Sequence, residues 1–147
     1  MPRRRPAAGS RPRGVPEVGC GLSPADRAVR LYPGIVPFVD ASELSPREPR
    51  AGWSGRFFHS EHMTFVYYAI DADAVPIHEH HHPEEEVWHV LEGQLAITID
   101  GRESVLGPGC AAIVPAGVPH SARPLGAGRA MVVDHPVRDR VGGVPTR

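Results

Sequence analysis

The segment His80–Gly93, HHHPEEEVWHVLEG, decides the fold, because a run of histidines leads directly into a strand and a turn. Alternate residues of a strand point to the same face, so His80 and His82 share one face. Two imidazoles with a nearby carboxylate, here Glu86, are the ligands that a first-row transition metal prefers. The segment predicts a metal site, with a surface metal-scavenging histidine tract as the alternative.

Short strands separated by turns continue on both sides of this segment. The pair Asp100-Gly101 is the strongest short hairpin signal, and the preceding residues alternate between apolar and polar. The chain contains 16 Gly and 17 Pro among 147 residues, which disfavours a helical bundle. We expect an all-β fold, a single small antiparallel β-barrel or jelly roll. The predicted strands are Arg56–His59, Met63–Ile70, Glu86–Leu91, Gln94–Ile99, Ser104–Leu106, Cys110–Val114, Val118–Arg123 and Arg129–Asp134.

A second segment, Gly109–His120, reads GCAAIVPAGVPH and carries another histidine after a Pro-x-Gly turn. The patterns His80-x-His82-x3-Glu86-x6-Gly93 and Gly109-x5-Pro115-x-Gly117-x2-His120 resemble the two motifs of the cupin superfamily. They are separated by 15 residues, as in small single-domain members. The resemblance covers about residues 60–135 and implies a small barrel with four inward ligands for one divalent ion: Fe, Mn, Zn or Ni. Those ligands would be His80, His82, Glu86 and His120.

The histidine cluster allows a second register, because His78 and His80 also share a strand face. A shift of the pair would move its centre by about 6.6 Å, the rise of two strand residues, whereas Glu86 stays anchored by its own turn. We therefore expect His80 and His82 to be the pair. Two non-ligand positions depart from the family motifs: Ala74 replaces Gly, and Pro124 replaces Asn.

Strand periodicity also sorts the other candidates. If Glu86 points inward, Trp88 does too and His89 points to the opposite face. His62, Thr64, Val66, Tyr68 and Ile70 share one face of their strand, and either face of that strand can line the barrel. Trp88 and Tyr68 are thus candidate substrate contacts and His62 a candidate acid or base, with packing as the alternative for each. Cys110 is expected to be a small core residue, and Glu84 and Glu85 are expected to be solvated.

The segment Val132–Asp139, VVDHPVRD, resembles the end of single-domain cupins that open unsaturated sugar acids. That resemblance implies that Asp134 acts on the substrate and that Arg138 holds its carboxylate. A closing salt bridge between Asp134 and Arg138 is the alternative. The chain departs from this group because Glu86 stands where the group carries Gln, and because its Asp-to-Arg gap is shorter.

Charge and composition divide the chain. Residues 1–22 are rich in Arg, Pro and Gly and predict a disordered tail, with a polyanion-contacting arm or a transit peptide as alternatives. Residues 23–51 form an irregular arm with one helical turn at 23–29, residues 52–140 form the barrel, and residues 141–147 form a C-terminal tail. Beyond residue 16 the chain holds 11 Arg and 17 acidic residues, which argues against a nucleic-acid partner. It contains no Lys, which excludes a Schiff-base mechanism.

These features predict a metal-dependent enzyme that acts on a small oxygenated metabolite. Within that class a dioxygenase and a non-redox isomerase, cyclase or lyase are both open, and a non-catalytic small-molecule-binding protein is the alternative. Two cysteines make no disulfide framework, which favours the cytoplasm. No apolar run is long enough for a membrane helix. We expect a homodimer.

Overall fold

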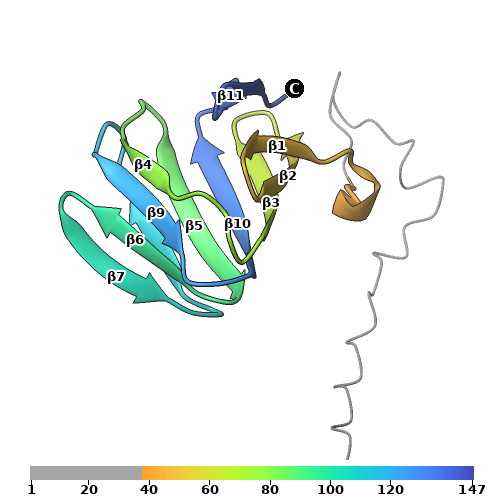
Figure 1. The fold of residues 1–147 in the computed structure, drawn as a ribbon. Coiled ribbons are helices and arrows are strands. Elements are labelled where there is room, and N and C mark those ends of the chain that lie inside the picture. Colours follow the sequence, from red (N-terminus) through yellow and green to blue (C-terminus); the bar gives the residue numbers. More distant parts are fainter. Residues whose placement is uncertain (1–37) are drawn as a thin grey trace, which may run out of the picture.

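Strands account for the regular structure of residues 38–147, the part of the chain that the computed structural model describes (Figure 1). The predicted disordered tail and the helical turn at 23–29 lie outside these residues. One short 3-10 helix, η1 (Ala41–Glu43), precedes the strands. In chain order the strands are β1 (Arg47–Arg50), β2 (Trp53–His59), β3 (Thr64–Ile70), β4 (Ile77–His80), β5 (Glu85–Glu92), β6 (Leu95–Ile99), β7 (Arg102–Leu106), β8 (Ala111–Val114), β9 (His120–Pro124), β10 (Gly128–His135), β11 (Arg140–Val141) and β12 (Val144–Pro145).

Two antiparallel sheets face each other. The larger sheet has the order β1-β2-β3-β10-β5-β8, and the smaller has the order β4-β9-β6-β7. Figure 1 shows the smaller sheet beside the larger one, with β11 above the upper end of β10. Strand β12 pairs with β11. The predicted all-β antiparallel barrel is confirmed, and its strands differ from the predicted ranges mostly by one to three residues at their ends.

The inner faces of both sheets form one apolar core. On β3 the face that carries Val66, Tyr68 and Ile70 is buried, which settles the choice that periodicity left open. The ring of Trp53 packs edge-on against Tyr68 and Trp88, with ring centroids 5.4 and 6.0 Å apart. Such aromatic pairs contribute beyond their buried area, by roughly 0.5–1.5 kcal/mol each. The three rings of this cluster line the cavity described below.

Two turns show how consecutive strands are connected: one joins the paired strands β6 and β7, and the other takes the chain from β5 in the larger sheet to β6 in the smaller sheet. Asp100 and Gly101 both have positive φ, 48° and 74°, which is the type I′ geometry that joins β6 to β7. At Gly93 a side-chain carbon would lie 2.4 Å from the carbonyl oxygen of Ala127, so only glycine fits. The first turn was predicted from its dipeptide, whereas the packing at Gly93 is a tertiary contact.

Strands also form outside the predicted barrel, both before it and after it in the sequence. Arg47–Arg50, within the segment expected to be irregular, forms β1 and pairs with β2. Pro49 within β1 is tolerated because β1 is an edge strand. The expected C-terminal tail contributes β12, and Arg47 donates a hydrogen bond to the carbonyl of Pro145. Each of these strands pairs with its neighbour in the sequence, β1 with β2 and β12 with β11, and the two ends of the chain also contact each other.

Cys110 is exposed, so its expected place in the core is wrong. It lies in the turn before β8, where its N–H donates to the carbonyl of Gly107 at 3.0 Å. The strand begins one residue later than predicted, and Cys110 therefore never enters the inner face.

Candidate metal centre and adjoining pocket

Three imidazole rings meet at one end of the barrel. His80 on β4 is the direct cross-strand partner of His120 on β9, and their ring centroids lie 4.3 Å apart. His82 follows β4, and its carbonyl accepts a hydrogen bond from the N–H of Gly117 at 2.8 Å. This bond ties the histidine-rich segment to the Pro-x-Gly turn. As a result, one donor nitrogen from each of His80, His82 and His120 lies within 4.8 Å of the others.

The backbone sets the tautomer of two of these rings. Nδ1 of His80 lies 2.8 Å from the carbonyl oxygen of His78, and Nδ1 of His120 lies 2.9 Å from that of Val118. A carbonyl only accepts, so each Nδ1 carries the proton and each neutral ring presents an Nε2 lone pair. Metal-binding histidines are usually oriented in this way. Burial also holds the pKa of His80 below its usual value, which favours the neutral form.

Glu86 on β5 adds a carboxylate to the three rings. It is 3% exposed, with Oε1 3.2 Å from Nε2 of His120 and Oε2 3.4 Å from Nε2 of His82. Burial raises the pKa of Glu86, but the adjacent His120, His82 and Trp88 outweigh that effect and hold the pKa well below its usual value. Glu86 is therefore an anion at neutral pH, and its Oε1 accepts a hydrogen bond from Nε1 of Trp88.

These four residues fit a divalent metal ion. Nε2 of His120 is fully buried and makes no hydrogen bond within residues 38–147, although a Glu86 oxygen lies near it. A buried polar atom without a partner is costly, and a metal bond is one way to satisfy it. Three imidazole nitrogens with one carboxylate suit first-row transition metals such as Fe, Mn, Zn or Ni.

The remaining histidines of interest lie outside this cluster. His78 is exposed, and it contacts the cluster through its backbone carbonyl. His89 lies on the outward face of β5, opposite Glu86 and Trp88, as strand periodicity predicts. His62 lies before β3, where 71% of its side chain is exposed, and pairs loosely with Glu61 at 3.8 Å. The structure therefore does not bring His62, a candidate acid or base, to the site, because β3 begins at Thr64.

Asp134 on β10 faces Glu86 as its direct cross-strand partner. It is fully buried, and its Oδ2 has no hydrogen-bond partner among the described residues. Burial and the negative charge of Glu86 raise the pKa of Asp134 to about 8, against the opposing effect of Arg138. Asp134 thus holds a proton at neutral pH next to the candidate metal ligands.

Arg138 connects the acidic side of the site to the C-terminal segment. Its Nη1 lies 3.0 Å from Oε2 of Glu86 and 3.5 Å from Oδ1 of Asp134. The salt bridge expected as an alternative is therefore present, although Glu86 is the closer carboxylate. The backbone of Arg138 is held by Thr64, whose Oγ1 accepts its N–H at 2.9 Å, and by Thr146, whose hydroxyl donates to its carbonyl.

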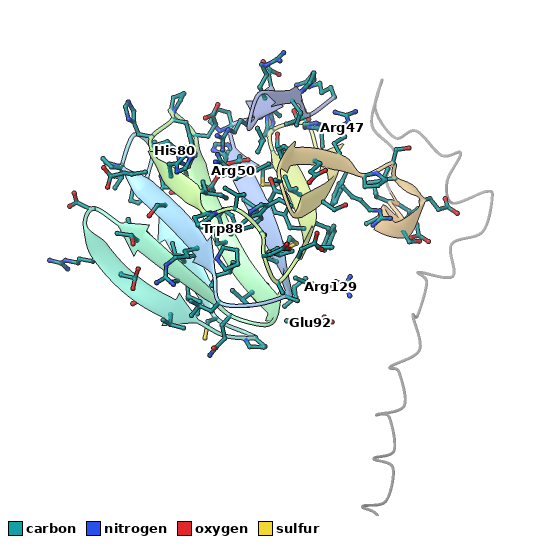
Figure 2. The ribbon with its side chains drawn as sticks, viewed as in Figure 1. Arg47, Arg50, His80, Trp88, Glu92 and Arg129 are labelled. Atoms are coloured by element: carbon teal, nitrogen blue, oxygen red, sulfur yellow. The ribbon has the colours of Figure 1, made fainter. Side chains whose placement is uncertain are left out.

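A cavity of about 250 Å³ opens beside these residues. Its polar lining comes from His80, Glu86, Asp134, Arg138, Tyr68 and Arg50. Its apolar lining includes Trp53, Val66, Ile77, Trp88, Val132 and Val141. Burial and the nearby carboxylates raise the pKa of Tyr68, so its hydroxyl stays protonated. Figure 2 shows His80, Trp88 and Arg50 in the same upper part of the barrel.

Sequence reasoning missed three contributors to this site. Glu84, expected to be solvated, lies 3.2 Å from Nδ1 of His82, and its side chain is mostly buried. The spacing of two residues between His82 and Glu84 is a feature of the sequence that could have predicted this contact. Arg50 and the threonine pair that holds Arg138 carried no local signal, because segments far away in the chain bring them to the cavity.

The geometry defines a class: a two-sheet β-barrel with a three-histidine, one-glutamate cluster at one end. Residues 66–136 match the family described as "Cupin domain". Residues 66–136 therefore form a cupin domain within the barrel. An RmlC-like cupin from Shewanella frigidimarina NCIMB 400 has the same fold, with a TM-score of 0.65 at 23% identity over 69% of this chain and 92% of that chain. KdgF from Halomonas sp. gives a TM-score of 0.63 at 21% identity over 69% of this chain and 94% of that chain.

A curated enzyme matches over a shorter stretch. Quercetin 2,3-dioxygenase from Bacillus subtilis (strain 168) is 45% identical over 51 residues, which are 35% of this chain and 15% of that enzyme. The chain therefore matches only a small part of the length of this relative. Within residues 38–147 no helix is long and apolar enough to span a membrane.

Proposed function

We propose that this protein is a metal-dependent enzyme that acts on a small oxygenated metabolite carrying a negative charge. The observation that carries this proposal is the fully buried carboxyl group of Asp134, whose Oδ2 has no hydrogen-bond partner among the described residues, beside a set of four metal-type donors. A structural metal site alone would not need a further buried acid that lines an adjoining cavity. The cavity of about 250 Å³ lies below the range of roughly 300–1,000 Å³ typical of drug-sized ligands, which favours a small substrate.

Each residue has a role in this proposal. His80, His82, Glu86 and His120 hold one divalent ion, which when bound supplies Lewis acidity toward a substrate oxygen. Arg138 orients an anionic group of the substrate through its guanidinium.

The other groups of the pocket bind the substrate and move a proton. The indole of Trp88 and the ring of Tyr68 pack against the body of the substrate. Asp134, whose carboxyl group lines the cavity, gives a proton to one substrate atom or takes it from another.

Asp134 favours non-redox chemistry, such as isomerisation, cyclisation or elimination. Each of these reactions moves a proton between substrate atoms and requires no oxidant. A dioxygenase is the second candidate, and it is favoured by the 45% identity to a segment of quercetin 2,3-dioxygenase. A protein that binds a small molecule without turnover is the alternative outside enzymes.

Metal analysis followed by turnover assays tests the proposal. The purified protein is expected to hold about one equivalent of a divalent metal after reconstitution at neutral pH. Turnover of oxygenated acids without O2, abolished in Asp134→Asn although the metal is retained, supports the non-redox enzyme. Turnover that requires O2 and survives in Asp134→Asn supports the dioxygenase. Ligand binding without turnover in either atmosphere would leave the binding protein as the correct interpretation.

We also propose a homodimer in the cytoplasm. Ile113 on the edge strand β8 is 63% exposed, and Val105 on the edge strand β7 is 55% exposed. Apolar edge strands are ready sites for pairing with a second chain. Light scattering at micromolar concentration tests the dimer, and a mass near 16 kDa would contradict it.

A further inference from the structure

We propose that Arg50 is a second anion-binding residue of the pocket and that the substrate is a small diacid. One acidic end lies at the metal donors and Arg138, and the other reaches Arg50. This inference rests on the proposed function, because it assumes that the pocket beside the metal donors binds the substrate. It adds a specificity-determining residue that no sequence motif contains.

The position of Arg50 is well defined. It ends β1 and faces Trp53 across the tight turn into β2. The turn is held from both sides: Gly52 N–H donates to Oε1 of Glu48 at 2.8 Å, and Val75 N–H donates to the carbonyl of Ala51 at 3.0 Å. A side-chain carbon at Gly52 would lie 2.5 Å from Cα of Ala74, so this turn packs closely on the loop before β4.

The side chain of Arg50 is directed to the cavity. Arg50 is half-buried and lines the same cavity as His80, Glu86 and Arg138. In Figure 2 Arg50 lies near His80 and Trp88, whereas Arg47 lies at the opposite end of β1, away from them. A guanidinium within the lining of a mostly apolar cavity is a strong and selective contact for a carboxylate.

Arg50 lacks a counterion within residues 38–147. The hydrogen bond that it makes there goes to the carbonyl of Pro76 at 3.4 Å, which is long for such a bond. Arg138, the other arginine of the cavity, pairs with Glu86, whereas Arg47, Arg56 and Arg140 donate to backbone carbonyls outside the cavity lining. A partly buried positive charge without a carboxylate partner is costly unless a ligand supplies one.

The charge of the whole pocket supports a diacid. With a divalent ion bound, the positive groups are the ion, Arg138 and Arg50. The negative groups are Glu86 and Asp134, which line the cavity, and Glu84, which lies 3.2 Å from Nδ1 of His82. The pocket therefore carries excess positive charge, and Arg50 is the cation of this set without a carboxylate partner among residues 38–147, so a second carboxylate of the ligand would have a place there.

Two matched probes test this inference with the Co(II)-loaded protein. 2-Oxoglutarate and 2-oxovalerate share a metal-chelating 2-oxo acid end and chain length, and only 2-oxoglutarate has a distal carboxylate. We expect the wild type to bind 2-oxoglutarate about tenfold more tightly, as measured by calorimetry and by the Co(II) absorption spectrum. Arg50→Gln is expected to abolish this preference by weakening 2-oxoglutarate alone, and Arg50→Lys to retain part of it. Arg129→Gln, which removes the same charge at the opposite end of the barrel in Figure 2, should change neither affinity.

The outcomes separate this inference from the proposed function. Equal affinities for the two acids in the wild type, or an equal loss for both in Arg50→Gln, would overturn the role of Arg50 while leaving a ligand-binding metal site in place. Failure of the protein to bind Co(II), or of either acid to change its spectrum, would overturn the proposed function and this inference together. Thermal melting of each variant reports whether it is folded.

Discussion

The guanidinium of Arg138 donates a hydrogen bond to Nε2 of His82, with 3.1 Å between the two nitrogens. Arginine has no acceptor, so Nε2 carries the lone pair and the proton of the neutral ring lies on Nδ1, 3.2 Å from a Glu84 oxygen. A metal ion held by His82 through Nε2 would need the same lone pair. Arg138 and a metal ion therefore compete for His82, and also for Glu86, which Arg138 contacts at 3.0 Å.

Replacement of Arg138 by Met is expected to strengthen metal binding in the absence of substrate. The variant removes both a competing hydrogen-bond donor and a positive charge beside the site, and we expect a gain of about tenfold in affinity. Titration of Zn(II) against a competing chelator measures it. Arg129→Gln serves as a charge-matched control and should leave the affinity unchanged. Weaker metal binding in Arg138→Met would show that the arginine supports the metal site instead of competing for it.

Single histidine substitutions test which register of the cluster holds the metal. His82→Ala and His120→Ala should each lower metal affinity by tenfold or more, because each removes a donor. His78→Ala should have little effect, because His78 contacts His80 only through its backbone carbonyl, which alanine retains. A larger loss in His78→Ala than in His82→Ala would reverse the ligand assignment while leaving the fold intact.

Metal affinity should fall as the pH decreases. Burial lowers the pKa of His120, but the adjacent Glu86 and the Val118 carbonyl raise it more, and the net shift is above its usual value of 6.5. Because a protonated imidazole cannot bind metal, competition from protons should already begin above pH 6.5. Chelator-competition titrations between pH 5 and 8 measure this dependence, and an affinity that stays constant down to pH 6 would contradict it.

Asp134 should make the metal-free protein less stable as the pH rises. Its pKa is about 8 in the folded protein against 3.8 for an ordinary aspartate, so the folded state holds the proton that the unfolded state releases. The stabilising contribution is complete below about pH 4 and is lost as the pH rises toward 8.

Asp134→Asn is isosteric and cannot titrate, so it should remove this dependence. At pH 8 the variant is expected to be more stable than the wild type by an amount on the order of a few kcal/mol. Urea denaturation of both metal-free proteins at several pH values measures the difference. Parallel stability curves for the two proteins between pH 5 and 8 would rule out a raised pKa at Asp134.

Thr64 should stabilise the C-terminal segment through its hydroxyl. Thr64 is fully buried, and its Oγ1 accepts the N–H of Arg138 at 2.9 Å. Thr64→Val keeps the shape and leaves that N–H unpaired, so we expect a loss of roughly 1–3 kcal/mol in the free energy of unfolding. Ser121→Ala, in the other sheet, is a control that should cost less. An unchanged stability in Thr64→Val would show that water or another group replaces the hydroxyl.

Local patterns in the sequence were sufficient for much of the fold and for the candidate ligands. The Asp100-Gly101 turn was predictable because two adjacent residues determine it, and the inward face of β5 was predictable from the alternation around Glu86. The alternation of the histidine run and the nearby carboxylate pointed to His80, His82 and Glu86, whereas His120 was identified through the resemblance of its segment to the second cupin motif. The structure brings these four side chains together, and whether they bind metal remains a prediction.

Only the tertiary structure decided the features that depend on segments distant in the chain. Arg50 reaches the cavity because β1 adds to the edge of a sheet whose other strands come later in the sequence. Asp134 acquires its raised pKa because strand register places it opposite Glu86 in a buried site. Hydrophobic alternation and turn chemistry act over a few residues and can be read locally, whereas burial, strand register and the environment of a charge arise only when the chain is packed.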